Sequence, residues 1–267
     1  MTQQTSSMQY ETILFEVNNG IATLTLNRPD VFNAFNEQQS FDVIDALKKT
    51  ERDKSIRVLI LTGAGKAFCS GQDLKSIAGA KNRSLSESLY KRYNPMIKAM
   101  RSLPVPIICK LNGVAAGAGC SMALASDMII AAENASLIEV FVNVGLVLDS
   151  GSSYFLPRLV GSAKAFELAT MGTKVTAAQA LEWGMVNKVV TSEQLDEETM
   201  KVAQYYAQAP TKAISLIKKM LNKSFHSDLD TMLQYEAYCQ EIAGRSADYK
   251  EGVTAFNEKR KPAFTGN

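Results

Sequence analysis

The sequence predicts an α/β fold followed by a helical C-terminal region, and three patterns support this prediction. Apolar runs typical of strands alternate with amphipathic segments from residue 13 to residue 150. After Ser152 such runs become rare and helical periodicity dominates. Two of the strand-like runs lead into loops of glycine and other small residues, with a helix start beyond each loop. Because strands that alternate with helices pair in parallel, we expect a largely parallel sheet.

The first half of the chain contains most of the expected strands. Residues 1–9 are polar, and we expect a disordered tail there. The Asn18-Asn-Gly20 run predicts a hairpin, and Asn36 is suited to cap a helix that ends near Arg52. A second long helix is expected over Ser86–Ser102, after a small, polar and mobile segment at Ile77–Arg83. The strands are expected at Ile13–Val17, Ile21–Leu26, Arg57–Thr62, Val105–Cys109, Met128–Ala132 and Ser136–Val140.

The second half is expected to be helical, apart from one strand at Val186–Val190. Its helices are predicted at Ala163–Met171, Ala177–Trp183, Ser192–Gln208, Thr211–Ser224, Leu229–Ala243 and Ala247–Lys259. We therefore divide the chain into a tail (1–9), an α/β core that holds the site (10–200) and a helical C-terminal region (201–267).

Composition narrows the class of protein. The chain has 267 residues, 46% of them hydrophobic and 21% charged, and a formal net charge of +2. This charge gives no reason to expect nucleic acid, and no apolar run is long enough to span a membrane. The start of the chain lacks a signal-peptide core, and the four cysteines form no CxxC pair, so we expect a cytoplasmic protein with free thiols and no metal site. The lone His226 is interpreted as structural or solvent-facing.

The two small-residue loops are the first candidates for a functional site. One runs from Cys109 to Cys120 and contains Gly113, Gly117 and Gly119, and the other is Gly65–Leu74. A loop with so few side chains allows another group to approach its backbone closely. A single loop of this kind is equally consistent with close helix packing, but two similar loops favour a site.

These loops resemble the two oxyanion-hole segments of the crotonase (enoyl-CoA hydratase/isomerase) superfamily. The resemblance extends to Leu26-Asn-Arg-Pro29 with Asn33-Ala34, to Ala180–Val186 and to Phe256–Pro262, and thus covers nearly the whole chain. It implies a crotonase-like spiral of ββα units, a helical C-terminal trimerisation region, and trimers or hexamers. It also implies an acyl-CoA thioester as substrate, with no further cofactor.

The resemblance places the oxyanion-hole donors at the backbone N–H groups of Gln72 and Ala118. Two such donors stabilise the enolate that a thioester forms when it loses an α-proton. The two catalytic glutamates of the hydratases are absent, because Ser121 and Phe141 occupy their positions. Asp149 stands where the isomerase branches of the family carry an acidic residue, including the ring-1,2-epoxyphenylacetyl-CoA isomerases of phenylacetate breakdown.

Asp149 has two interpretations. It precedes Ser-Gly-Ser-Ser, so it is also suited to cap a helix, but the two loops and the missing glutamates favour a catalytic role. Burial would raise its pKa and a helix N-terminus would lower it, and the sequence does not rank these effects. Glu139 is the second candidate acid or base, although strand alternation predicts that it faces solvent or the rim.

The sequence therefore predicts an acyl-CoA isomerase, which forms oxepin-CoA from the ring epoxide or shifts a double bond in an enoyl-CoA. An enoyl-CoA hydratase is the alternative. A non-catalytic RNA-binding relative is a more distant one, because the only basic clusters, Lys218-Lys219 and Lys259–Lys261, have no interleaved aromatic residues. The resemblance implies contacts with coenzyme A or substrate at Val31, Ala34, Ser70, Gly71, Asp73, Leu74, Gly117, Phe141, Phe256 and Lys259.

Overall fold

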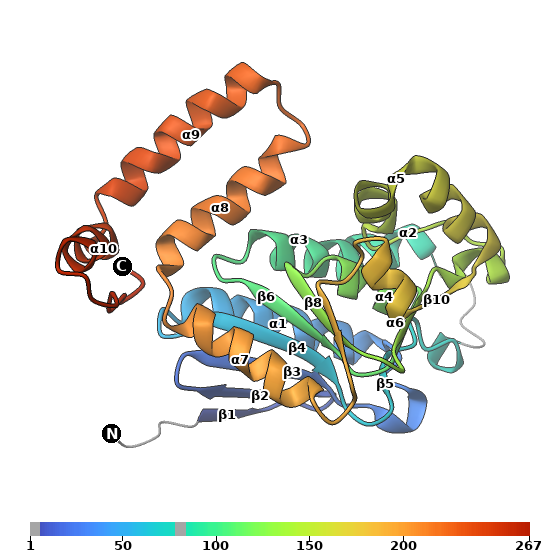
Figure 1. Cartoon of the computed structure of the whole chain (residues 1–267). Helices are drawn as coiled ribbons and strands as arrows, with labels where there is room; N and C mark the ends of the chain where they lie inside the picture. Colours follow the sequence, from blue (N-terminus) through green and yellow to red (C-terminus); the bar gives the residue numbers. More distant parts are fainter. Residues whose placement is uncertain (1–5, 78–83) are drawn as a thin grey trace.

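The computed structural model describes residues 6–77 and 84–267, whose strands form two sheets (Figure 1). The seven-stranded sheet has the order β1-β2-β3-β4-β6-β8-β11 and is antiparallel from β1 to β3 and parallel from β3 onward. Its strands are β1 (Ser6–Gln9), β2 (Ile13–Asn18), β3 (Ile21–Leu26), β4 (Val58–Gly63), β6 (Ile107–Leu111), β8 (Met128–Ala132) and β11 (Lys188–Val190).

A four-stranded sheet of the order β10-β9-β7-β5 lies beside it. Its strands are β5 (Ala67–Cys69), β7 (Val114–Ala116), β9 (Ser136–Ile138) and β10 (Lys174–Thr176). Along the chain β4 is followed by β5, β6 by β7, and β8 by β9, so each turn adds one strand to each sheet. This repeated placement is the expected spiral of ββα units.

Helices cover both faces of the larger sheet. Helix α7 (Leu195–Ala207) packs on β3, β4, β6 and β8, and Figure 1 shows α1 (Glu37–Arg52) and α3 (Asn94–Ser102) on the opposite side. Every residue of β4 is buried for this reason, as is typical of a parallel sheet between helix layers. The expected Asn36 cap of α1 is confirmed, because its side chain accepts from the Gln39 N–H.

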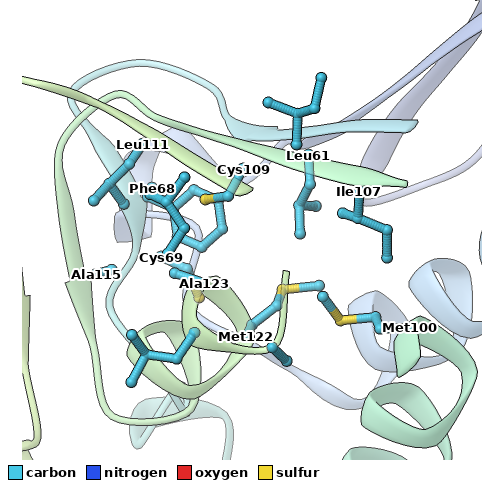
Figure 2. Packing of buried hydrophobic residues seen from close by; sticks show 14 of the residues in the cluster. Leu61, Phe68, Cys69, Met100, Ile107, Cys109, Leu111, Ala115, Met122 and Ala123 are labelled. Carbon is cyan, nitrogen blue, oxygen red and sulfur yellow. The ribbon is translucent and has the colours of Figure 1, made fainter. Parts of the chain in front are cut away.

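The core fixes the Cys109–Cys120 loop, which is the second of the two glycine loops along the chain. Helix α4 (Ala118–Leu124) starts directly after this loop, and all seven of its residues are buried. Figure 2 shows Met122 and Ala123 of α4 beneath Cys109 of β6 and close to Cys69 of β5. All four side chains are essentially inaccessible. The loop is therefore held between two rigid elements.

Several sequence-based expectations need correction. Residues 6–9 are not disordered, because they pair with β2 in register Ser6↔Val17 to Gln9↔Leu14. The expected helix over Ser86–Ser102 is α2 (Leu85–Ser88) and α3 joined by a π-helical turn, Leu89–Tyr93. Residues 1–5 of the predicted tail, and residues 78–83 of the segment predicted to be mobile, lie outside the described residues.

Helices α5 (Ser152–Met171) and α6 (Ala177–Glu182) follow β9 along the chain, and α5 is interrupted at Gly161, whose φ is +76°. In the described part of the chain, short 3-10 turns occur at Pro29–Val31, Lys75–Ile77 and Val140–Val144. In α5 the helical part before Gly161 was not predicted, whereas Ala163–Met171 was.

The C-terminal helices extend away from the sheets. Figure 1 shows α8 (Thr211–Ser224) beside α9 (Leu229–Gly244), with α10 (Ala247–Asn257) at the end far from α4 and α5. Residue 200, the predicted boundary, lies inside α7, which packs on the sheet. The projecting helices bury few side chains and leave large apolar ones exposed: Ile217, Leu221, Phe225, Leu229, Leu233, Tyr238, Tyr249, Val253 and Phe256.

Candidate active site

A cavity of about 270 Å³ lies where the two glycine loops meet. Its walls come from the first loop, the start of α4, the α2 region and the segment between β9 and α5. The lining residues are Ser70, Gly71, Gln72, Leu74, Leu85, Ser88, Leu89, Tyr93, Gly117, Ala118, Val140, Phe141, Val144, Leu146, Val147, Leu148 and Asp149. Asp149 is the one carboxylate among these described residues, and most of the others are apolar.

The first glycine loop, Gly65–Leu74, is fixed against the turn that precedes α1. Gly71 C=O accepts from Phe35 N–H (2.7 Å), and Asp73 N–H donates to Phe35 C=O (2.9 Å). In this one-residue parallel bridge the N–H of Gln72, which lies between the two, points away from Phe35. The Gln72 side chain is also held, because it donates to Phe35 C=O and accepts from the Tyr93 hydroxyl.

The second loop turns at Gly117, which has φ +52° and ψ −125°, a region that only glycine adopts readily. A Cβ on Gly71 would lie 2.8 Å from the Ala116 carbonyl oxygen and 3.5 Å from the Ala118 nitrogen. The two loops therefore approach each other backbone to backbone. Ala118 is the first residue of α4, so its N–H has no helical acceptor.

Gly119 allows two elements of the fold to approach each other closely. A Cβ at this position would lie 2.2 Å from the Cys69 carbonyl oxygen. Glycine at this position allows α4 to pack directly on β5. Gly119 thus fixes the position of the loop and does not line the cavity.

Asp149 reaches the cavity because of an unusual turn. Ser150 and Gly151 both have positive φ, +51° and +87°, directly before α5. The N-terminal cap of α5 is Gly151 without a side-chain hydrogen bond, so the Asp149 carboxylate is not the cap. Its Oδ1 accepts from Ser150 Oγ (2.7 Å). Burial raises the pKa of Asp149 and the Ser150 hydrogen bond lowers it, with burial the larger effect.

Glu139 is buried, which contradicts the expectation of a solvent or rim position. Strand β9 ends at Ile138, so strand alternation does not apply to Glu139, whose side chain is only 3% exposed. Its Oε1 accepts from Ser152 Oγ (2.8 Å). Burial raises the pKa of Glu139 to about 7, the Asp149 charge adds to the rise, and hydrogen bonds from Ser152 and Cys120 oppose it.

The structure does not bring every predicted contact residue to the cavity. Val31, Ala34 and Asp73 do not line it; Asp73 instead forms an ion pair with Arg28 and accepts from the N–H groups of Lys75 and Ser76. Phe256 is 84% exposed on α10, and Lys259 follows that helix. In this protomer Phe256 lines a separate hollow between α8, α9 and α10.

The sequence analysis did not identify the wall formed by Leu85, Leu89 and Tyr93. Helical periodicity placed Leu89 and Tyr93 in the expected helix Ser86–Ser102, but only the fold shows that this segment faces the glycine loops. The basic pair Lys218-Lys219 is not a surface cluster, because Lys218 is buried and contacts Asp127 (2.7 Å).

The predicted structural role of His226 agrees with its stacking on Tyr154. No group of three or more potential metal-binding side chains occurs among residues 6–77 and 84–267. None of the helices in the described part of the chain has the length and apolar character needed to cross a membrane.

A ββα spiral whose turns bring two glycine loops and one carboxylate to a single cavity defines the crotonase class of fold. Comparison with known proteins agrees. A family model described as enoyl-CoA hydratase/isomerase matches residues 16–267. The chain therefore belongs to the enoyl-CoA hydratase/isomerase family.

Individual relatives span nearly the whole chain. It is 45% identical to 1,2-epoxyphenylacetyl-CoA isomerase of Escherichia coli, covering 96% of this chain and 99% of that protein. It is 35% identical to trans-2-decenoyl-[acyl-carrier-protein] isomerase of Streptococcus mutans, covering 97% and 100%. The crystal structure of enoyl-CoA hydratase from Bacillus anthracis superimposes with a TM-score of 0.89 at 33% identity, covering 99% and 100%. The first match confirms the resemblance to ring-epoxide isomerases, while both isomerases and hydratases occur among the relatives.

Proposed function

We propose that this protein is an acyl-CoA isomerase in which Asp149 is the single acid and base. The observation that carries the proposal is the cavity itself, an apolar pocket whose one carboxylate is Asp149 among the described lining residues. Ser121 and Phe141 occupy the positions of the hydratase glutamates, and Ser121 is fully buried behind the pocket. A hydratase needs groups that hold and activate water. In this pocket the apolar side chain of Phe141 occupies the position of one such group.

The reaction begins with the thioester oxygen near the backbone N–H groups of Gln72 and Ala118. The Asp149 carboxylate removes a proton from carbon, and the two N–H groups stabilise the enolate that forms. The protonated Asp149 then returns the proton to a different carbon, so the product has the same mass as the substrate. Removal of one such N–H donor typically costs about 3 kcal/mol of transition-state stabilisation.

The substrate proposed first is ring-1,2-epoxyphenylacetyl-CoA, with the oxepin form as product, because the E. coli relative is named for the epoxide. A shift of a double bond in an enoyl-CoA needs the same groups and is the second substrate class. No cofactor is needed in either case. Enoyl-CoA hydration remains the alternative function, supported by the hydratase relative.

Coenzyme A contacts and assembly belong to the same proposal. Phe256 lies on α10 and Lys259 directly after it, at the end far from α4 and α5, so we assign both to the CoA site of a neighbouring subunit. The exposed apolar side chains of α8 to α10 support a trimer or hexamer, because a patch of this extent normally marks an interface.

The test is a panel of acyl-CoA substrates, including the ring epoxide, analysed by mass spectrometry with wild type and Asp149→Asn. An isomerase leaves the mass unchanged, and the variant should lose turnover by at least about a hundredfold while it still binds acyl-CoA. Addition of one water to crotonyl-CoA at a comparable rate would establish the hydratase alternative. Wild-type turnover by Asp149→Asn would refute the role of Asp149.

A further inference from the structure

The Glu139 carboxyl group is buried beside the cavity and has no part in the proposed reaction. Its chain neighbours Val140 and Phe141 line the cavity, whereas Glu139 lies behind them. Oε2 has no hydrogen-bond partner of ordinary geometry among the described residues, although the Cys120 thiol lies nearby. A buried carboxyl group with one firm hydrogen bond is costly. Its position therefore calls for an explanation beyond packing.

Two serine hydroxyl groups connect Glu139 to the candidate site. Ser152 Oγ contacts Glu139 Oε1 (2.8 Å), and Ser121 Oγ lies 2.7 Å from Ser152 Oγ. Ser121 Oγ is also 3.1 Å from the Asp149 carbonyl oxygen and 3.2 Å from the Gly117 carbonyl oxygen. Both hydroxyl groups belong to residues with no exposed surface. The chain of contacts thus ends on two peptide groups of the site.

One of these peptide groups is the one that carries the Ala118 N–H. The Gly117 carbonyl and the Ala118 N–H form a single peptide unit, so a hydrogen bond to the oxygen polarises the N–H on the other side. The other carbonyl belongs to Asp149, the residue with the proposed catalytic carboxylate. A hydrogen bond that Ser121 donates to either carbonyl therefore polarises the backbone beside the Ala118 N–H or beside the Asp149 carboxylate.

The direction of the hydroxyl chain depends on Glu139, because each serine hydroxyl has one proton. When Glu139 is ionised, Ser152 donates to it, and the Ser152 oxygen can then accept from Ser121, which competes with the two carbonyls for the Ser121 proton. When Glu139 is protonated, it can donate to Ser152, Ser152 to Ser121, and Ser121 to a carbonyl. The two states differ by one proton on Glu139, which is exchanged with solvent, and by the orientation of the serine hydroxyl groups.

We propose that Glu139 is a positioning residue of the active site, which acts through Ser152 and Ser121 on the Gly117–Ala118 peptide and the Asp149 backbone. This inference rests on the proposed function, in which the Ala118 N–H and the Asp149 carboxylate are the working groups. Protonated Glu139 strengthens the Ala118 donor. Ionised Glu139 removes that support and adds negative charge beside the enolate.

The groups that face Glu139 set the pH range of this effect. They are Ser152 from α5, the Cys120 thiol from α4, and the Asp149 carboxylate from the turn before α5. Cys120 is itself held neutral, because burial raises its pKa far above the ordinary value. Since burial raises the pKa of Glu139 to about 7, the chain reverses in the neutral range. Activity should therefore decline as pH rises through this range.

The experiment compares kcat against pH for wild type, Glu139→Gln and Ser152→Ala. Wild-type kcat is expected to fall by about threefold as pH rises through the range around 7, which is the size expected for loss of one cooperative hydrogen bond near the donor. In both variants kcat should no longer decline around pH 7. The decrease of kcat at acidic pH, which comes from protonation of Asp149, should remain. Ser136→Ala is the matched control, because Ser136 is a buried serine of β9 whose hydroxyl has no hydrogen bond among the described residues. It should keep the wild-type profile.

A second measurement needs no turnover. Acetoacetyl-CoA forms an enolate that absorbs in the near ultraviolet, and its bound enolate fraction reports the strength of the oxyanion donors. For wild type, this fraction should carry a transition near pH 7 that Glu139→Gln and Ser152→Ala remove. If no acyl-CoA is isomerised but the transition and its loss are observed, the proposed function fails and the role of Glu139 stands. Unchanged pH profiles in both variants, by both measurements, overturn the inference.

Discussion

Replacement of Glu139 by glutamine should stabilise the folded protein, and more strongly at alkaline pH than at acidic pH. The pKa of Glu139 is raised from 4.5 to about 7 in the folded protein by burial. A carboxyl group with a raised folded pKa contributes stability that is fully present below its unfolded pKa and is lost as pH rises through its folded pKa. Glutamine keeps an acceptor for Ser152 Oγ and is neutral at every pH, so it escapes this loss.

The magnitude follows from the two pKa values. At about 1.4 kcal/mol per pKa unit, ionisation of Glu139 should destabilise the folded state by about 3 kcal/mol above pH 8, and by only about 1 kcal/mol near pH 5. For a chain of this length, 1 kcal/mol corresponds to roughly 2 °C in Tm. We therefore expect Glu139→Gln to raise Tm by about 6 °C near pH 8.5 and by about 2 °C near pH 5, before any difference between glutamine and a neutral carboxyl group.

Scanning calorimetry at fixed protein concentration measures this difference, since Tm of an oligomer depends on concentration. Glu16→Gln is the control, because Glu16 is an exposed carboxylate on β2, so the same substitution there removes no buried acid. If Glu139→Gln lowers Tm at both pH values, or changes it equally at both, Glu139 is not the strained buried acid that the structure indicates.

Three further predictions concern the loops and the assembly. Ser150→Ala removes the hydrogen bond that lowers the pKa of Asp149, so the acidic limb of kcat should move to higher pH. Gly119→Ala places a Cβ against the Cys69 carbonyl and should destabilise the protein by more than about 2 kcal/mol in thermal unfolding, whereas Gly244→Ala, where a Cβ meets open space, should have little effect. Light scattering should give a trimer or hexamer mass, and an active monomer near 29.1 kDa would contradict the proposed assembly.

Periodicity predicted the long elements well and the short ones poorly. Helix Thr211–Ser224 was predicted with its observed bounds, because fourteen residues give a clear apolar stripe. Strands β5, β7 and β10, each of three residues, were not predicted, because too few positions define alternation. Strands β9 and β11 are equally short, but they lie within the predicted strands Ser136–Val140 and Val186–Val190. Two of the unpredicted strands follow or lie within the glycine loops, where the sequence alone suggested irregular backbone.

Some features of the candidate site were predicted from the sequence and others were not. The loops around Gln72 and Ala118 and the carboxylate of Asp149 were predicted from motifs, and the structure brings all three to one cavity. Burial of Glu139 was not predictable from alternation, because the strand ends one residue earlier and the chain turns. Whether Phe256 completes the CoA site depends on a second subunit.

The two carboxyl groups near the cavity differ in environment, and this difference argues for distinct tasks. Asp149 is partly exposed to the cavity and accepts one hydrogen bond from Ser150, so it can exchange a proton with a substrate. Glu139 is buried behind the wall and contacts only Ser152 by a firm hydrogen bond, so it reaches the substrate only through other groups. The Asp149 charge raises the cost of ionising Glu139, coupling of this kind acts in both directions, and the proposed reaction begins with an ionised Asp149. A neutral Glu139 therefore favours an ionised Asp149, and the range of highest activity should lie above the pKa of Asp149 and below about 7.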